Sequence, residues 1–317
     1  LGVGRKRPSF RRSPIRSGEA LHRRLTPPMS DAIGYRSQAW LGPSGTIHRA
    51  GDASMAVQST RLKRLIPALI TPAWAVHCDL QGPGSDRIKL LKEIARGPSA
   101  VKVLDVVGAT PEDGEALHGW THVTRHTRHL DLPPSAEVIP WPSHRLKQER
   151  RFLREGGCVE VNPANGWQEV RSLHLQSRAR KSLDGRPEAL TALLENLRHE
   201  PWAYNVVAYD REGNPVASGG FVRLSNGATV YAFGGQQRSK ASGLASVAMV
   251  MAAGKVAQGR GSHVLDFGGS LDPGVDRFYK ELGGKAVAVS RFIQCPLWFR
   301  RMFPGTWRAW TQQSTMV

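Results

Sequence analysis

Three predicted strands, followed by a polar loop and a helix of small residues, constrain the fold of this chain more than any other feature. The strands cover 204–209, 215–224 and 228–233. Asn226-Gly227, between the last two, is a strong signal for a tight hairpin turn, so the three strands are predicted to form an antiparallel meander. The polar segment 234–242 then leads into a predicted core helix over 243–258.

Alternating helices and strands extend over most of the remaining chain. Ahead of the meander, helices are predicted over 86–96, from 111 onward, and over 144–155 and 187–199, and strands over 101–107, 123–132 and 158–161. After it come a strand over 263–267, a loop over 268–270, a helix over 272–282 and a strand over 286–292. Gly97-Pro98 and Gly283-Gly284 are typical helix stops, and Asp272-Pro273 is a typical helix start. We therefore expect an α/β (α+β) fold.

The 317 residues are predicted to form four parts. Residues 1–60 are rich in Gly, Pro, Ser and Arg with little apolar periodicity, which predicts a basic, mostly disordered arm. The length suits one large or two modest domains, and the resemblance described below assigns 61–163 and 164–300 to two halves, with 301–317 as a tail.

The chain is strongly basic, with 44 Lys and Arg against 26 Asp and Glu and a formal net charge of +18. Residues 1–28 contain eight of these cations and one acid, so +7 of the charge lies in the arm. This excess favours a polyanionic partner. We interpret the arm as a solvated tail or as an extension ahead of a start at Met29. The alternative is a nucleic-acid-binding arm, which would make the chain a non-catalytic nucleic-acid-binding protein.

Cysteine usage and hydropathy favour a cytoplasmic protein. The three cysteines, Cys78, Cys158 and Cys295, are far apart and provide neither a disulfide framework nor a CxxC pair. No apolar stretch approaches the roughly 20 residues that cross a bilayer, and the basic N-terminus lacks the apolar segment of a secretory signal.

Several classes of site lack support. GxSxG, GxxxxGK[ST] and complete GxGxxG motifs are absent, so nothing favours a hydrolase, an NTPase or a dinucleotide enzyme. His122, His126 and His129 are spaced like metal ligands, but on a strand His129 would face away from the other two, so we predict no metal. For the cluster of Trp298, Trp307 and Trp310 with nearby arginines, aromatic core contacts beside a solvated tail are favoured over base stacking or a membrane surface.

Four segments together resemble one family. They are 129–133 (HLDLP), the basic helix 145–154 followed by Gly156-Gly157, 265–270 (LDFGGS) and 278–283 (FYKELG). In this combination the chain resembles the FemAB-like branch of the GNAT acyltransferase superfamily over roughly 60–300. The resemblance implies tandem GNAT-like halves, each a mixed, largely antiparallel sheet flanked by helices. It also implies an acyl group transferred to an amine or hydroxyl acceptor, and it points to cell-wall or polysaccharide precursors in cell-envelope biosynthesis.

The loop before the helix at 243 is the predicted cofactor site. Unpaired backbone N–H groups and the helix dipole at such a junction suit the pyrophosphate of coenzyme A. The GNAT motif there is Gln/Arg-x-x-Gly-x-Gly/Ala, and this chain has Lys240 in place of the first residue while keeping Gly243 and Ala245. The resemblance implies acyl-CoA, with acetyl-CoA as the default, as co-substrate. The predicted contacts are Phe233, Gly234, Gln236, Gln237, Arg238, Lys240, Ser242, Gly243, Leu244 and Ala245.

Three residues are the predicted catalytic set. Tyr279 matches the GNAT tyrosine that protonates the departing thiolate, and a phenol with a pKa near about 10 is neutral at pH 7. Asp266 ends a strand where it could hold or deprotonate an amine, or could instead bind the backbone amides of Gly268-Gly269. Ser270 could line the same site or start the next helix.

An alternative donor is aminoacyl-tRNA, which Fem-type peptidoglycan ligases use. Those enzymes tend to have Phe-Lys where this chain has Phe278-Tyr279, a departure that favours a thioester donor. The tRNA hypothesis would use basic groups to hold phosphates. These groups are the helix 145–154 and the cluster Arg171, Arg178, Arg180, Lys181 and Arg186.

Overall fold

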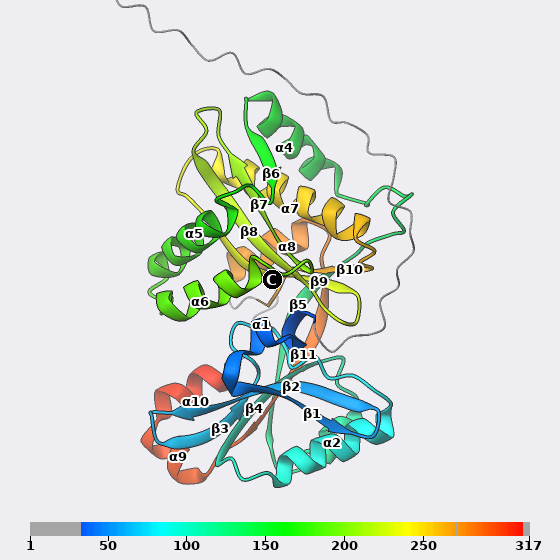
Figure 1. Cartoon of the computed structure of the whole chain (residues 1–317), viewed down its shortest axis with the longest axis vertical. Coiled ribbons are helices and arrows are strands. Elements are labelled where there is room, and N and C mark those ends of the chain that lie inside the picture. Colours follow the sequence, from blue (N-terminus) through cyan, green and yellow to red (C-terminus); the bar gives the residue numbers. More distant parts are fainter. Residues whose placement is uncertain (1–32, 270–271, 313–317) are drawn as a thin grey trace, which may run out of the picture. The chain divides into compact units, whose positions relative to one another are not determined.

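The computed structural model describes residues 33–269 and 272–312 (Figure 1). Residues 1–32, which include most of the predicted arm, and Ser270 lie outside the described residues. The predicted α/β fold is confirmed, because the strands join one 11-stranded sheet with helices on both faces. None of the helices within the described ranges is long and apolar enough to cross a membrane.

The elements follow in chain order. The first part contains the short helices η1 (Gly34–Arg36), α1 (Gln38–Leu41) and η2 (Gly42–Ser44), then β1 (Gly45–Ala50), β2 (Ala53–Leu62), β3 (Ile66–Ile70), α2 (Gly84–Arg96), β4 (Val101–Val107), α3 (Pro111–Ala116), β5 (Thr121–Asp131) and α4 (Ser143–Arg154). The second part contains β6 (Cys158–Val161), α5 (Gly166–Arg180), α6 (Pro187–Leu197), β7 (Ala203–Tyr209), β8 (Pro215–Arg223), β9 (Ala228–Gln236), α7 (Ser242–Gly259), β10 (Val264–Asp266), α8 (Pro273–Glu281), β11 (Lys285–Gln294), α9 (Leu297–Met302) and α10 (Pro304–Thr311).

The sheet interleaves strands from both predicted halves. Its order is β1-β2-β3-β4-β11-β5-β10-β9-β8-β7-β6. The pairs β3/β4 and β9/β10 are parallel and the others are antiparallel. β11 lies between β4 and β5, and β5 also pairs with β10. Hydrogen bonds between strands join the two predicted halves into one sheet, so the sheet shows no boundary at 163/164. The division there stays a prediction.

Successive residues of a strand point to opposite faces of the sheet, and in these strands both sets include apolar side chains. Helices therefore cover both faces. On the β7-β8-β9 meander, Val206 and Phe221 belong to a core with α4 and α7, while Val222 and Val230 belong to a core with α5 and α6. The other end of the sheet repeats this arrangement. Here α2 covers one face, and α9 and α10 cover the opposite one.

Two neighbouring strands separate at the centre of the sheet. β10 pairs with β9 only from Val264 to Asp266, opposite 228–230. β9 continues to Gln236 and stays paired with β8. After Asp266 the chain turns at Gly268, whose φ of 73° is a backbone conformation that glycine adopts without strain. The part of β9 from 231 to 236 therefore has no strand on the side of β10.

The structure corrects the sequence analysis in three places. Residues 33–60, predicted within a mostly disordered arm, form η1, α1, η2, β1 and most of β2, and Tyr35, Met55 and Val57 are fully buried. The helix α5 was not predicted. Part of the predicted tail forms α10, whose Trp307 and Trp310 make the expected aromatic core contacts beside Phe299, whereas Trp298, for which such contacts were also favoured, is 45% exposed.

Candidate active site

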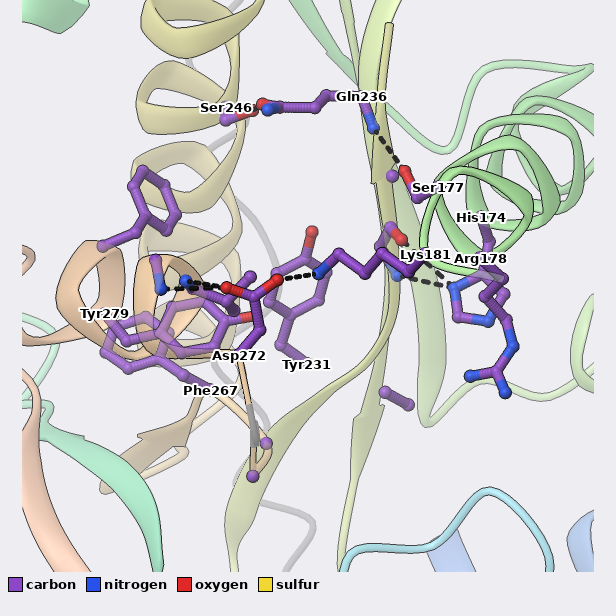
Figure 2. A pocket seen from close by; sticks show the side chains of 18 of the residues that line it. His174, Ser177, Arg178, Lys181, Tyr231, Gln236, Ser246, Phe267, Asp272 and Tyr279 are labelled. Carbon is purple, nitrogen blue, oxygen red and sulfur yellow. Dashed lines mark hydrogen bonds and ion pairs between the residues drawn. The ribbon is translucent and has the colours of Figure 1, made fainter. Parts of the chain in front are cut away.

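A cavity of about 1070 Å³ occupies the opening where β9 and β10 separate (Figure 2). Its walls come from β9, the start of α7, the loop after β10 together with α8, the C-terminal half of α5, and α4. The central strands β4, β5 and β11 and the segment 74–76 close it. The opening follows from the strand register, because the side of β9 past Val230 is free of a paired strand.

The described lining of this cavity is strongly basic. Its cations are Arg125, Arg145, Arg151, Arg178, Arg180, Lys181, Arg238, Lys240 and Arg291. Only two carboxylates accompany them among the described lining residues, and both are already paired: Asp105 accepts two hydrogen bonds from Arg291 at 2.7 and 2.9 Å, and Asp272 lies 2.6 Å from Lys181. Such an excess of positive charge in a concave site favours an anionic ligand.

The predicted cofactor residues divide between the cavity and the core. Those that line the cavity are Gly234, Gln236, Gln237, Arg238, Lys240, Gly243 and Leu244. Phe233 instead packs in the core against Trp40, and Ala245 is fully buried on the inner side of α7. Ser242 is also buried, and its hydroxyl donates to the Ser239 carbonyl at 2.8 Å. The loop and the first turn of α7 therefore bring polar backbone, Gln and basic side chains to one wall, while the role of each residue stays a prediction.

α5 contacts the free edge of β9. Nδ1 of His174 lies 3.1 Å from the carbonyl oxygen and 3.4 Å from the amide nitrogen of Gly234. The backbone amide of Gln236 donates to Ser177 Oγ at 3.3 Å (Figure 2), and the backbone carbonyl of Gln236 accepts from Arg180 at 2.6 Å. These three side chains satisfy backbone groups that the strand opening leaves without a partner strand.

The contact between α5 and β9 depends on a glycine. A Cβ at Gly235 would lie 2.2 Å from the carbonyl carbon and oxygen of Leu173 and 2.6 Å from the amide of His174. The helix therefore sits directly on the strand. Burial, with a smaller contribution from the nearby Arg178, lowers the pKa of His174 from 6.5 to about 4, although the bond to Gly234 opposes the shift. His174 is thus neutral near pH 7.

Tyr279 faces the cavity among other aromatic rings. Its ring stacks on Phe267, with centroids 5.1 Å apart and planes 6° apart, and meets Tyr231 edge to face at 6.2 Å. Within the described residues, no group forms a hydrogen bond with its hydroxyl. Burial raises the pKa of Tyr279 well above 10, and the neighbouring Tyr231, Asp266 and Asp272 raise it further. The phenol is therefore protonated and free to donate a hydrogen bond to a ligand.

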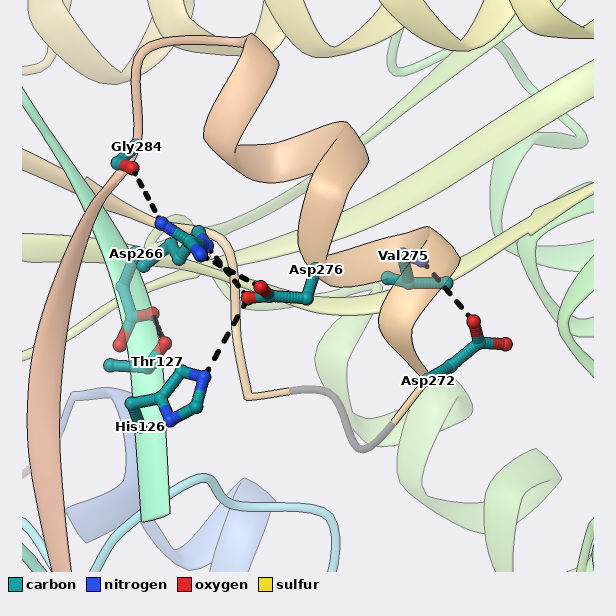
Figure 3. Close-up of polar contacts among 8 residues, drawn as sticks. His126, Thr127, Asp266, Asp272, Val275, Asp276 and Gly284 are labelled. Atoms are coloured by element: carbon teal, nitrogen blue, oxygen red, sulfur yellow. Dashed lines mark hydrogen bonds and ion pairs between the residues drawn. The ribbon is translucent and has the colours of Figure 1, made fainter. Parts of the chain in front are cut away.

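Asp266 has several partners inside the protein (Figure 3). Its carboxylate accepts from Thr127 Oγ1 and from the Gly268 amide at 2.9 Å, and Nε2 of His129 lies 3.4 Å away. Burial alone would raise the pKa of this carboxyl, but the interactions with His129 and Thr127 outweigh it and hold the pKa below its ordinary value. Asp266 is thus a buried carboxylate that binds the turn after β10. This arrangement matches the amide-binding alternative, and the role as a base stays a prediction.

A buried ion pair holds α8 to the sheet. Nε and Nη2 of Arg128 on β5 donate to the two carboxylate oxygens of Asp276 at 2.6 and 2.7 Å, and Nη1 donates to the Gly284 carbonyl at 3.2 Å. Alternate residues of β5 point to opposite faces of the sheet. Arg128 therefore reaches α8 while Thr127 and His129 meet Asp266 on the other face. The sequence analysis missed this pair, since the two residues are 148 positions apart with no local motif.

Of the three predicted catalytic residues, the structure describes two, and only one of these lines the cavity. Tyr279 lines the cavity, whereas Asp266 is buried beside β5 and is not among the lining residues. Ser270 lies outside the described residues. Among the side chains that the structure adds to the cavity wall are two from α5, His174 and Ser177, which lie one turn apart, and the rings of Tyr231 and Phe267. The only sequence signal for the two α5 residues is the 3–4 spacing of Val170, Leu173 and Ser177.

No protein-family model and no curated protein matches this chain. Solved structures do match. FemX superposes with a TM-score of 0.64 at 12% identity, covering 86% of this chain and 93% of that one. The C-terminal domain of a putative lysylphosphatidylglycerol synthetase from Agrobacterium fabrum gives 0.56 at 12% identity, covering 86% and 90%. L-PGS from Bacillus licheniformis gives 0.55 at 12% identity, covering 84% and 90%. The chain therefore shares its fold with FemX, in agreement with the resemblance to the FemAB-like branch noted in the sequence.

Proposed function

We propose that this protein is an acyltransferase that moves an acyl group from acyl-CoA, with acetyl-CoA as the default donor, to an amine or hydroxyl acceptor. One observation supports the proposal most directly: a single cavity joins the free edge of β9, the basic loop before α7 and the Tyr279 hydroxyl. The fold, shared with FemX, is one that supports group transfer. The resemblance noted in the sequence makes a cell-wall or polysaccharide precursor the proposed acceptor.

The anionic end of the donor would bind at the start of α7. Arg238 and Lys240 lie in the loop there, and Gly243 is exposed with open space around its Cα. Backbone N–H groups at the beginning of an 18-residue helix attract phosphate, because they lack partners and lie at the positive end of the helix dipole. Within the described residues, Arg238 and Lys240 form no ion pair and are free to bind phosphate.

The reaction would proceed by direct attack. The acceptor nitrogen or oxygen forms a bond to the thioester carbonyl carbon while the carbon–sulfur bond breaks and its electron pair goes to sulfur. The N–H groups of Gly234 and Gln236 are already bonded to His174 and Ser177, so the oxygen that becomes negative would be stabilised by the N–H of Ala232, which also lines the cavity. Tyr279 donates a hydrogen bond to the leaving sulfur, and the proton lost by the acceptor restores the thiol. The raised pKa keeps the phenol protonated throughout this sequence.

Ligand-induced thermal stabilisation tests the donor. At 100 times its Kd, a ligand that binds only the folded protein adds roughly 2.7 kcal/mol to the free energy of unfolding. For a chain of 317 residues this corresponds to an increase in Tm of roughly 4 °C. We expect this increase with coenzyme A and acetyl-CoA, and we expect Gly243→Glu to abolish it, because an exposed carboxylate there repels phosphate without any steric clash.

Gly259→Glu is the matched control. Gly259 lies at the other end of the same helix and is exposed, and a Cβ added to it would have no atom within 4 Å. This variant should keep the full increase in Tm. Absence of any shift at millimolar ligand in the parent protein would rule out a coenzyme A donor.

A second candidate function keeps the reaction and changes the donor to aminoacyl-tRNA. Arg145 and Arg151 bring the basic helix α4 to the same cavity that Arg178, Arg180 and Lys181 of the α5 region line. The similarity in fold to FemX also favours it. This candidate predicts tRNA binding whose affinity falls steeply with salt and is weakened by Arg178→Gln. Binding that is absent, or insensitive to salt, would exclude it.

A further inference from the structure

An apolar surface remains exposed on α9, none of whose residues lines the cavity. Leu297, Trp298 and Met302 are 68%, 45% and 66% exposed, whereas Phe299 between them is fully buried. Residues 298 and 302 are four positions apart and so lie on one face of the helix. The inner face of α9 holds the helix on the sheet, and the outer face presents large apolar side chains to solvent.

The turn between β2 and β3 extends this surface. Leu65 in the turn is 78% exposed, while Leu62 and Ile66 on either side pack into the same core as Phe299. The ammonium group of Lys63 lies 5.6 Å from the ring centroid of Phe303, directly after α9. The turn and the helix are therefore neighbours. We call Leu65, Leu297, Trp298 and Met302 together the α9 patch.

The surroundings of the α9 patch are cationic. Lys63, Arg64, Arg301 and Arg308 are exposed, and none of them forms an ion pair with any described residue. Neither residues 53–72 nor residues 295–312 contain a single Asp or Glu. Arg300 lies over the Trp307 ring with its guanidinium carbon 4.3 Å from the centroid, which adds a further charge beside the aromatic groups.

We propose that the α9 patch binds the surface of an anionic lipid bilayer. Leu, Met and Trp side chains would enter the boundary between headgroups and acyl chains, where a tryptophan ring is favourable, and the cations around them would contact lipid phosphates. A nucleic acid would also meet the cations, but it offers nothing for Leu65, Leu297 and Met302 to bury against. The anchor is peripheral and reversible, since it consists of one short helix and one turn.

Co-sedimentation of the full chain with vesicles tests this inference, which does not depend on the acyl donor. The protein should pellet with vesicles of phosphatidylcholine that contain phosphatidylglycerol and should remain largely in solution with phosphatidylcholine alone. Replacing Leu297, Trp298 and Met302 together by serine should weaken vesicle binding at least tenfold. Each CH₂ group that is no longer buried in the lipid removes roughly 0.8 kcal/mol, which weakens binding about fourfold. Arg64→Gln with Arg301→Gln should weaken it by about fivefold per charge.

Two variants elsewhere serve as controls. Leu183→Ser removes an apolar side chain of similar exposure, and Arg96→Gln removes an exposed charge on α2, which covers the opposite face of the sheet from α9. Both should bind vesicles like the parent. Thermal unfolding should be unchanged in the control and arginine variants, whose substituted side chains are exposed. The triple variant also loses the edge-to-face contact of Trp298 with Phe299, so its unfolding transition is measured to verify that it is folded.

Three results would overturn the inference. The first is a parent protein that does not pellet with the anionic vesicles. The second is a triple serine variant that pellets as well as the parent, since the basic residues 1–28 would then account for binding. The third is a parent that self-associates in solution while the triple variant is monomeric, which would identify a second copy of the chain as the partner of the α9 patch.

Discussion

Replacing Gly235 by alanine is predicted to push α5 away from β9. The added Cβ would meet backbone atoms of Leu173 and His174 at 2.2–2.6 Å, and backbone atoms cannot rotate away as a flexible side chain can. Ordinary contacts need more than 3 Å, so the helix must move outward by about 1 Å. Overpacking of this kind typically costs about 1–3 kcal/mol.

The same displacement would weaken the polar contacts on the free edge of β9. His174, Ser177 and Arg180 contact the backbone of Gly234 and Gln236 at 2.6–3.4 Å, and each such hydrogen bond contributes about 0.5–1.5 kcal/mol. With partial loss of these contacts, we expect the free energy of unfolding to fall by about 3 kcal/mol. At about 2.1 cal/mol/K per residue over 317 residues, this lowers Tm by roughly 4–5 °C.

Scanning calorimetry or thermal unfolding followed by circular dichroism measures the difference, with Gly243→Ala as the matched control. Gly243 has no atom within 4 Å of an added Cβ and lies in the first turn of α7, so alanine there should leave Tm unchanged or raise it, by up to about 1 kcal/mol of stability. If Gly235→Ala proves as stable as Gly243→Ala, then α5 does not rest on β9, and this wall of the cavity is wrongly placed.

Two further changes test the chemistry of the cavity. Tyr279→Phe should lower kcat by about 10²–10³-fold while leaving the Tm increase with acetyl-CoA intact, because only the hydrogen-bond donor to the leaving sulfur is removed; equal loss of binding would show a role in holding the donor. For His174, the pKa of about 4 in the folded protein lies below 6.5, so the unfolded chain binds the extra proton as pH falls through this window. The free energy of unfolding should therefore decrease between pH 6.5 and 4, by up to about 3 kcal/mol, and His174→Gln, measured by urea unfolding at several pH values, should show a smaller decrease. An identical pH dependence in the two proteins would contradict the burial of His174.

Local signals in the sequence were sufficient for most single elements. The strands predicted over 101–107 and 158–161 have the same bounds as β4 and β6, because glycines and prolines punctuate the chain beside them. The first ordered segment was missed for the opposite reason. Its strands β1 and β2 are joined by a tight turn at Gly51, with a φ of 56°, inside a stretch of mixed small and polar residues whose periodicity is weak.

α5 and the pairing of β11 could not be obtained in the same way. The buried stripe of α5 is short, Val170 and Leu173 being its buried apolar side chains, because the rest of the helix faces the cavity or solvent and carries polar groups there. β11, from the second half, pairs with β4 and β5 of the first half. The paired residues are more than 150 positions apart in the sequence, such as Lys285 and His129. Neither composition nor spacing encodes a register at that distance.

The same limit explains why the loop of the candidate site could be located from the sequence, whereas the cavity beside it could not. Gln236 to Gly243 could be named because a polar loop before a helix is a local pattern. The cavity itself exists because β10 stops at Asp266 while β9 continues, and Asp266 stabilises that stop by accepting the Gly268 amide. The sequence left Asp266 either to hold or deprotonate an amine or to bind the Gly268-Gly269 amides, and its contacts in the structure maintain the opening. Asp266→Asn would keep the volume of the side chain and remove its charge, and on this reasoning it should lower stability as well as activity.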